Sequence, residues 1–316
     1  MPGITGMGTT YNLPNFVGEL FEITPSDTPL LSAIGGLTGG KPASATEFQW
    51  QTYDLRDADQ NVKKEGAPAP EGESRVRSNA SNILQIHQET IDVSYTKQAA
   101  KDNLSGLNVS GSNPVQDELS FQTQAMLKQV ARDVEFSFIR GTYHKPADNT
   151  TARKTRGVLE AITTNIITNA SPTVLSEKMV LDLMQKVWDN GGIKESETAT
   201  LMTNSALKRA LSKIFVTDKN YREQTRNVGG VNLMTIETDF GTVNIMLNRN
   251  MPADQLAVLS MEQLSPVFLE IPGKGHFFLE ELAKTGANTK YQIYGEIGLE
   301  YGNQIAHGKI TNVKAE

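Results

Sequence analysis

A long amphipathic pattern over residues 114–140 is the feature that most constrains how this chain can fold. Asn113 suits the N-cap, and Pro114 suits the first helical position, where a missing backbone N–H costs nothing. Gly141 provides a stop for the helix. At 1.5 Å of rise per residue the helix would be about 40 Å long, well above the usual length in globular proteins. The pattern therefore predicts a rod-like helix.

One side of this helix is predicted to be buried. Its apolar residues recur at helical spacing and are Leu119, Met126, Val130, Val134 and Phe138, with Leu127 and Ile139 widening the stripe. The charged residues expected off the stripe are Lys128, Arg132, Asp133 and Glu135. One long helix in an ordinary α+β domain is the alternative interpretation.

Residues 46–95 precede the helix and predict two strands joined by a long polar loop. Phe48 and Trp50 fall on one face of the first strand. The loop, residues 54–81, has too little apolar surface to form a core of its own. The returning strand changes its alternation before Ile91, which can mark a bulge or a twist. We therefore expect an arm that projects from the body and rejoins it near Ile91. An ordinary hairpin with an unusually long loop is the alternative.

Residues 1–45 are rich in Gly, Pro and Thr and carry isolated apolar residues, among them Phe16 and Phe21. Such a segment must find apolar partners elsewhere, either on its own body or on a neighbouring molecule. We interpret it as an N-terminal arm, with a disordered tail as the alternative.

Residues 159–268 are typical of a compact α+β unit. Ser176 and Asn204 are predicted helix caps, and Trp188 is expected on the buried side of the first of these helices. Further along, residues 291–301 alternate more clearly than any other part of the chain and predict a strand.

Composition excludes several classes of function. The 316-residue chain has no cysteine, so disulfides, thiol chemistry and cysteine-bound metals are excluded. No apolar run approaches the roughly 20 residues that span a membrane, and the N-terminus lacks the pattern of a signal peptide. The net charge of −6 argues against a protein that grips nucleic-acid phosphates. A protein that merely encloses nucleic acid needs no basic surface.

Signals of catalysis are weak. Residues 35–41 have the glycine and lysine spacing of a phosphate loop, but Pro42 stands where Ser or Thr would bind magnesium. The histidines are far apart in the sequence, and none has the spacing of a metal ligand. We therefore expect no catalytic residue, no cofactor and no metal site.

Taken in order, these segments resemble the major capsid protein of tailed bacteriophages, which has the Hong Kong 97 fold. The resemblance rests on the order and lengths of the parts and on short runs at residues 155–159 and 199–204. It implies an α+β fold with an N-terminal arm, an extended β-hairpin loop, a long spine helix, and peripheral and axial domains. The implied divisions are residues 1–45 for the arm, 46–95 for the extended loop, 96–158 for the peripheral domain with its spine helix at 114–140, 159–268 for the axial domain, and 269–316 for return strands of the peripheral domain.

The resemblance implies a structural protein that assembles into pentamers and hexamers of an icosahedral or prolate shell. The shell would enclose double-stranded viral DNA without sequence-specific binding and without a membrane. Expected partners are other copies of the chain, a scaffolding protein, a portal and a decoration protein. The expected location is the virion, after assembly in the cytoplasm of the host bacterium. Candidate inter-subunit contacts are Phe16, Phe21, Trp50, Lys63, Lys64, Arg75 and Arg77.

Three alternatives stay open at this point. The basic residues of the loop could serve solubility alone. An encapsulin-like compartment shell shares the fold. A cytoplasmic enzyme or a carbohydrate-binding module would require a deep pocket with converging polar groups in residues 159–268. The sequence also shows no long charged helix ahead of the arm, so a separate scaffolding protein or a cleavage event is expected.

Overall fold

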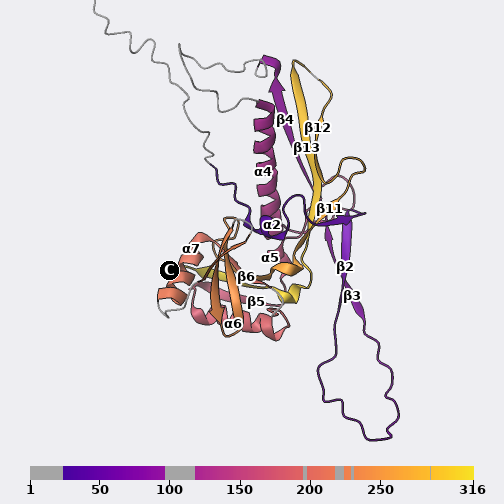
Figure 1. Cartoon of the computed structure of the whole chain (residues 1–316), viewed down its shortest axis with the longest axis vertical. Coiled ribbons are helices and arrows are strands. Elements are labelled where there is room, and N and C mark those ends of the chain that lie inside the picture. The colour runs from indigo at the N-terminus through magenta and orange to yellow at the C-terminus, as the bar shows by residue number, and fades with distance from the viewer. Residues whose placement is uncertain (1–23, 97–117, 195–197, 218–223, 229–230, 285) are drawn as a thin grey trace, which may run out of the picture.

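The computed structural model describes residues 24–96, 118–194, 198–217, 224–228, 231–284 and 286–316. These residues form two β-sheets, a long helix that packs along the first sheet, and a hairpin that projects from the first sheet (Figure 1). The expectations for Phe16, Phe21 and Asn113 fall outside the described residues. Within the described residues, no helix is both long enough and apolar enough to cross a lipid bilayer.

The predicted long helix is present as α4, Glu118–Arg140. Its 23 residues correspond to a length of about 35 Å. Burial is concentrated in its second half, where the apolar stripe is fully covered at Val130, Val134, Phe138 and Ile139. Gly141 follows the last helical residue, Arg140, and only glycine fits there because a side chain would collide with the carbonyl oxygens of Ser137 and Thr155. Two details differ from the prediction: Leu127 is exposed, and Glu135 is fully buried.

The first sheet lies beside α4. Its strand order is β1-β11-β13-β12, and β4 pairs with β13 as well. The strands are β1 (Lys41–Ala43), β4 (Gln85–Ser94), β11 (Ser265–Leu269), β12 (Phe277–Glu281) and β13 (Asn288–Glu300). The short helices α2 (Pro29–Ile34) and α5 (Val158–Ala161) pack against α4. The predicted strand at residues 291–301 is therefore confirmed as the central strand of this sheet, β13.

The projecting hairpin consists of β2 (Glu47–Tyr53) and β3 (Arg77–Ile83), which pair in antiparallel register. The predicted loop ended at residue 81, but β3 already begins at Arg77. The chain also rejoins the body earlier than expected, because β4 pairs with β13 from Gln85 onward and not from Ile91. The change of alternation lies at Leu84, whose backbone N–H donates to the carbonyl of Thr46. From that residue on, the strand exchanges the hairpin partner for the sheet.

The second sheet has the order β5-β14-β10-β6-β9-β8-β7. Its strands are β5 (Ile166–Val174), β6 (Ala199–Thr203), β7 (Gln224–Val228), β8 (Val231–Thr238), β9 (Gly241–Leu247), β10 (Leu256–Ser260) and β14 (Gly308–Lys314). The expected division at residues 268 and 269 is wrong at two places. The strand β11 belongs to the first sheet, and β14 returns to the second, between β5 and β10.

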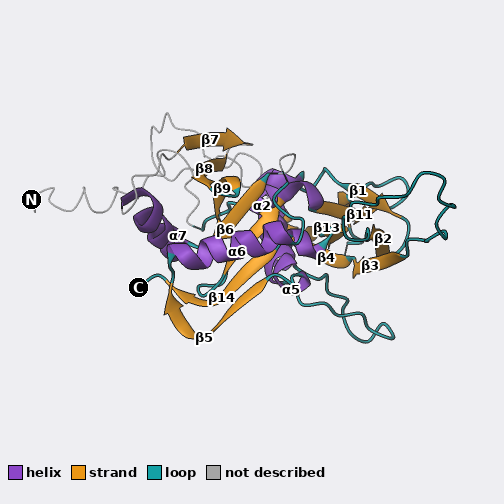
Figure 2. Cartoon of the chain, turned by 90° about the horizontal axis from the view of Figure 1, so that it is seen from below, coloured by secondary structure: helices purple, strands orange, loops and turns teal. Residues whose placement is uncertain are grey.

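Two helices cover one face of the second sheet (Figure 2). They are α6 (Glu177–Asp189) and α7 (Ser205–Ser212), and both predicted caps are confirmed. The Ser176 side chain accepts from the Met179 N–H, and the Asn204 side chain accepts from the Leu207 N–H. Trp188, expected on the buried side of α6, is instead 55% exposed. It stands next to the fully buried Val187, so the true apolar stripe ends one residue earlier.

The other face of the second sheet packs against the first unit. Leu201, Ile245 and Val258 join the core under α6 and α7. Their strand neighbours Met202, Met246, Ala257 and Leu259 join the core around α4, as expected from the two-residue period of a strand. Both faces of the second sheet are therefore buried, and the sheet lies between the two hydrophobic cores.

Candidate functional site

The loop between β2 and β3, residues 54–76, is the first candidate surface. Its residues are exposed throughout, and it extends well away from the body (Figure 1). Four large apolar side chains on the hairpin and loop are between 68% and 79% exposed, namely Tyr53, Leu55, Val62 and Val76. The subunit does not cover these apolar groups, so they are available for contact with another molecule.

The four basic residues predicted to contact another subunit lie on this loop or at its end. Lys63, Lys64, Arg75 and Arg77 lie on the loop or at its junction with β3, and all four are exposed. Arg75 pairs with Glu73 at 3.0 Å, and Arg77 donates to the side chain of Gln51 at 3.0 Å. The structure therefore distributes these cations along the hairpin and does not gather them into one site.

Trp50 has a role inside its own subunit. Its indole N–H donates to the carbonyl of Gly302 at 2.7 Å, and its ring meets Tyr301 edge to face at 4.7 Å. On the neighbouring edge of the hairpin, the Lys145 ammonium pairs with the Glu47 carboxylate. These contacts fix the base of the hairpin on the body, so Trp50 acts as an internal anchor.

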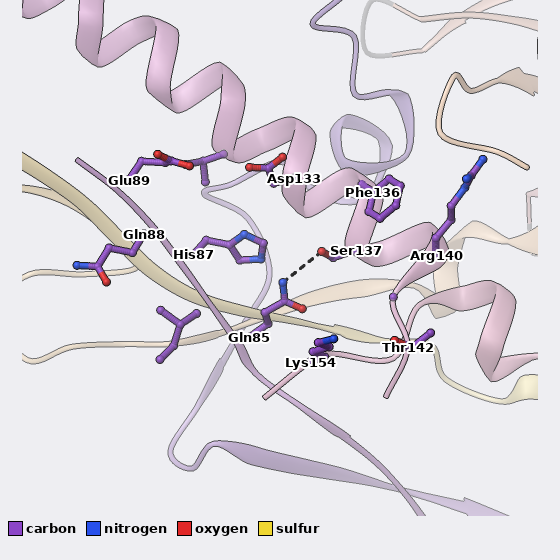
Figure 3. A pocket seen from close by; sticks show the side chains of 13 residues that line it. Gln85, His87, Gln88, Glu89, Asp133, Phe136, Ser137, Arg140, Thr142 and Lys154 are labelled. Carbon is purple, nitrogen blue, oxygen red and sulfur yellow. Dashed lines mark hydrogen bonds between the residues drawn. The ribbon is translucent and has the colours of Figure 1, made fainter. Parts of the chain in front are cut away.

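A groove between α4 and β4 is the second candidate surface (Figure 3). It has a volume of about 500 Å³ and is bordered by residues 85–89 of β4, the second half of α4, and Lys154. The Gln85 amide donates to the Ser137 hydroxyl across it at 3.3 Å. Phe136 is 48% exposed beside the groove, where the Arg140 guanidinium stacks on its ring. The groove thus combines an apolar wall with several polar groups.

His87 is the most unusual polar residue of this groove. Only 7% of the residue is exposed, and burial lowers its pKa from 6.5 to about 4. Its buried Nε2 atom has no hydrogen-bond partner among the described residues. Nearby on α4, burial raises the pKa of Asp133, although Gln129 and Arg132 oppose the shift. Both shifts arise because this region penalises charge.

A buried carboxylate joins α4 to two other parts of the chain. Glu135 accepts hydrogen bonds from the Leu30 N–H at 2.9 Å, the Leu31 N–H at 2.6 Å and the Asn248 side-chain amide at 2.6 Å. Desolvation raises its pKa, and these three bonds oppose the rise. One turn further along α4, Arg140 donates to the Asn250 carbonyl. Glu135 and Arg140 therefore clamp α2 and the connection between β9 and β10 onto α4.

Sequence reasoning missed Glu135, although a helical projection contains a signal. Position 135 lies three residues before Phe138 and four before Ile139, both on the buried stripe. A carboxylate at such a position must have buried donors. His87 also has a signal, because it shares the alternation of the buried Ile91 and Val93 on β4. The part of α4 that covers it, however, comes from a distant part of the chain.

Chemistry that needs converging reactive groups is not evident in the described residues. Nowhere in them do three His, Asp or Glu side chains gather closely enough to hold a metal ion. The best-buried histidine, His307, receives the Ser260 N–H at Nδ1 and contacts the Tyr301 carbonyl through Nε2. Both nitrogens thus serve the fold.

Comparison with known sequences gives a family and a curated relative. A family model described as SU10 major capsid protein matches residues 3–314. A curated relative, the major capsid protein of Escherichia phage Phieco32, is 25% identical over 348 aligned positions, which cover 93% of this chain and 92% of the relative.

Solved structures give a compatible result. The capsid asymmetric unit of cyanophage A-1(L) has a TM-score of 0.72 and 13% identity, with 96% of this chain and 97% of that chain covered. The SrpI encapsulin complex of Synechococcus elongatus has a TM-score of 0.64 and 13% identity, with 100% and 97% covered. The capsid of a native GTA particle has a TM-score of 0.62 and 11% identity, with 98% and 97% covered. At these identities the likeness concerns the fold alone.

Proposed function

Because the chain belongs to the SU10 major capsid protein family, we propose that it forms the pentamers and hexamers of a closed shell around double-stranded DNA. It is a structural capsid protein with the α+β Hong Kong 97 fold of phage capsids. Capsid proteins associate with their own copies, so self-association comes with the family. The geometry of the shell, its DNA content and the contacts between copies are our proposals.

The observation that carries the proposal is the unpartnered hairpin. A strand of seven residues and half of a 23-residue loop reach at most about 60 Å from the body when extended. The loop exposes apolar groups that its own subunit does not cover. A neighbouring copy is the natural partner, because a closed lattice of identical subunits multiplies many weak contacts.

We assign the contact residues accordingly. The residues that would contact the neighbouring subunit are Lys63, Lys64, Arg75 and Arg77. Trp50 would hold the base of the hairpin on its own subunit. Phe16 and Phe21 of the N-terminal arm would bind apolar surface on an adjacent copy. The first sheet with α4 would form the peripheral domain, and the second sheet with α6 and α7 the axial domain.

The remaining expectations are part of the same proposal. A net charge of −6 suits a wall that encloses DNA without adhering to it. A scaffolding protein, a portal and a decoration protein would act with the chain, and assembly would take place in the cytoplasm of the host bacterium. No catalytic step is needed for this role, so the chain would not be an enzyme.

An encapsulin-like compartment is the second candidate, and the likeness to the SrpI encapsulin complex favours it. Its TM-score is 0.64, whereas the cyanophage capsid reaches 0.72, and the family and the curated relative are both viral. The contents of purified particles separate the two roles, since a virion wall encloses DNA and a compartment encloses protein.

Deletion of residues 57–76 tests the proposal. The deletion leaves β2 and β3 intact and joins them through three residues, so the subunit should keep its melting temperature and its circular dichroism spectrum. Shells should be lost in negative-stain microscopy of the expressed protein together with its scaffold. A matched control replaces residues 57–76 with a Gly-Ser segment of equal length, which should also fail to form shells. Normal shells from either variant would contradict the role given to the loop.

A further inference from the structure

We propose that the basic face of α7, formed by Lys208, Arg209 and Lys213, contacts phosphate groups of the enclosed double-stranded DNA. This inference rests on the proposed function and goes beyond it by naming the part of the wall that the DNA contacts. It draws on the charge of α7, on the way its cations are paired in comparison with those of α6, and on the small side chains around them.

The helix α7 is basic in a chain that is acidic overall. It contains Lys208 and Arg209 and no acidic residue, and Lys213 follows directly at its C-terminal end. The whole chain, by contrast, has a net charge of −6. Cations that cluster on one helix are the electrostatic signature of a phosphate-binding surface. The net charge therefore describes the wall as a whole and not this helix.

Two cations of the basic face are exposed and have no ionic partner within the subunit. Arg209 and Lys213 lie four residues apart, so their side chains leave the helix on the same side. Neither of them forms an ion pair with any other described residue. On α6, the Lys178 ammonium pairs with Asp182 at 2.6 Å, and Lys186 donates to a backbone carbonyl of β5 at 3.1 Å. The cations of α6 thus serve the fold, whereas Arg209 and Lys213 are available to a ligand.

The side chains around the basic face suit a nucleic acid better than a protein. Ser205 and Ala206 are exposed on α7, and Ser212 is half-buried. Side chains of this size leave room for a phosphate backbone, and serine hydroxyls donate hydrogen bonds to phosphate oxygens. Contacts between proteins are instead enriched in aromatic residues and depleted of lysine. An exposed aromatic residue of that kind is present on α6, as Trp188, while the sequence of α7 contains none.

The strength of the contact fits a wall that encloses DNA. The three cations of one subunit can neutralise at most three phosphates, so a single subunit binds DNA weakly. In a closed shell the same contact is repeated in every copy, and the repeated contacts act together. The basic faces would then hold the outermost DNA at a fixed distance, while the acidic remainder of the wall does not bind it.

The salt dependence of DNA binding tests the contact. The unassembled full-length chain is titrated with a short fluorescent duplex at several NaCl concentrations, and binding is followed by anisotropy. The double variant Arg209→Gln, Lys213→Gln should bind about tenfold or more weakly at about 50 mM NaCl. The slope of log K against log [NaCl] should become shallower by about 1.8, because two phosphate contacts are removed.

A matched control separates the contact from the overall charge. The variant Lys178→Gln, Lys186→Gln on α6 lowers the net charge by the same two units. Its affinity for the duplex should stay within about twofold of the wild type, and its salt slope should be unchanged. An equal loss of affinity in the two variants would mean that DNA responds only to the net charge of the subunit.

Photo-cross-linking in DNA-filled shells locates the contact independently. Because the chain has no natural cysteine, Ser205→Cys can be labelled selectively with a benzophenone maleimide. Position 205 is exposed and lies one helical turn before Arg209. Irradiation should attach the labelled subunit to DNA. The same label at Thr90→Cys, on an exposed position of the first sheet, should give little or no attachment.

A purely structural role for these cations leads to a different result. Cations near the end of a helix also interact favourably with its dipole, so the Arg209→Gln, Lys213→Gln variant would then melt at a lower temperature and keep its affinity for DNA. Unchanged affinity and salt slope in this variant would overturn the inference. If its shells also fail to form, the basic face would belong to an acidic protein partner.

The cross-linking experiment has two outcomes that contradict the inference. These are equal attachment from positions 205 and 90, and no attachment from position 205 in shells that contain DNA. Each of the contradicting results leaves the proposed shell function intact. Failure of the wild-type chain to form shells with its scaffold would instead overturn the proposed function.

Discussion

Glu135 fixes where the chain enters the body from the N-terminal arm. Its carboxylate satisfies two backbone N–H groups at the start of α2 and the amide of Asn248. A second contact, the ion pair between Arg249 and Asp27 at 2.9 Å, lies on the exposed side of the same junction. One buried acid thus holds together three segments that are far apart in the sequence, which is why a charge persists on the buried stripe of α4.

Replacing Glu135 with Leu should destabilise the subunit by roughly 2–4 kcal/mol, because three buried donors lose their acceptor. Glu135→Gln keeps one acceptor oxygen and should lose about half as much. Urea unfolding measures both values. Hydrogen exchange should become faster at the amides of Leu30 and Leu31 in the Leu variant. Unchanged stability in that variant would show that α2 is held by its apolar contacts alone.

His87 should make the stability of the subunit depend on pH. Its pKa is about 4 in the folded chain and 6.5 in the reference state, so the unfolded chain takes up the proton first as the pH falls. Stability is therefore fully present above pH 6.5 and is lost between pH 6.5 and pH 4. At pH 5 the loss relative to pH 7.5 should be about 2 kcal/mol.

The His87→Gln variant removes this titration while keeping a polar side chain of similar size. Between pH 7.5 and pH 5 the wild type should therefore lose about 2 kcal/mol more stability than the variant, whatever the difference between the two proteins at pH 7.5. If the stability difference between the two proteins instead stays constant over this pH range, a carboxylate in the groove, such as Asp133 or Glu89, compensates the charge of His87.

At the level of elements, α4 depends on its buried second half. Val130 is fully covered, whereas Leu127 on the same helix is exposed. Val130→Asp would place a charge in the core and should cost roughly 3 kcal/mol or more. Leu127→Asp makes the same chemical change at the exposed position and should stay within about 0.5 kcal/mol. Thermal melting of the two variants gives the comparison, and equal losses would contradict the assigned orientation of the helix.

The elements that the sequence predicted well are those with local signals. The helix α6 combines the predicted Ser176 cap with an apolar stripe, and the strand β13 (Asn288–Glu300) matches the clear alternation at residues 291–301. The elements that were missed depend on distant partners. In the strand β14 two polar residues, Thr311 and Asn312, separate the buried Ile310 and Val313, so the alternation is interrupted where the register with β5 shifts. The strand is fixed by its pairing with β5 and β10.

The surfaces were harder to predict than the elements. Trp188 fits the helical period of α6 approximately, and only the packing of α6 on the sheet shows that this side chain faces outward. Trp50 was predicted to contact a neighbour because it lies on a projecting strand, but Gly302, which accepts its hydrogen bond, is 252 residues away in the sequence. The groove between α4 and β4 has no sequence signal, since it arises from two elements that each look ordinary.

At the scale of the whole molecule, the two units should unfold together. The second sheet is shared between both cores: Leu201 and Ile245 lie under α6 and α7, while Met202 and Met246 contact the core around α4. Loss of α4 would expose this second face to water, and loss of the second sheet would uncover α4. A sheet that is buried on both faces couples the two units, because neither unit can unfold without exposing apolar surface of the other.

Two probes can test this coupling, one in each unit. In a Trp188→Phe variant, the fluorescence of Trp50 reports the base of the hairpin and the first sheet. Hydrogen exchange at the amides of β6 and β10 reports the second sheet. We expect one shared urea midpoint for both probes, and Met246→Ala should shift the two midpoints equally, by an amount that corresponds to roughly 2–4 kcal/mol. Separate midpoints, or a shift confined to the second sheet, would mean that the two units are coupled only by the surrounding shell.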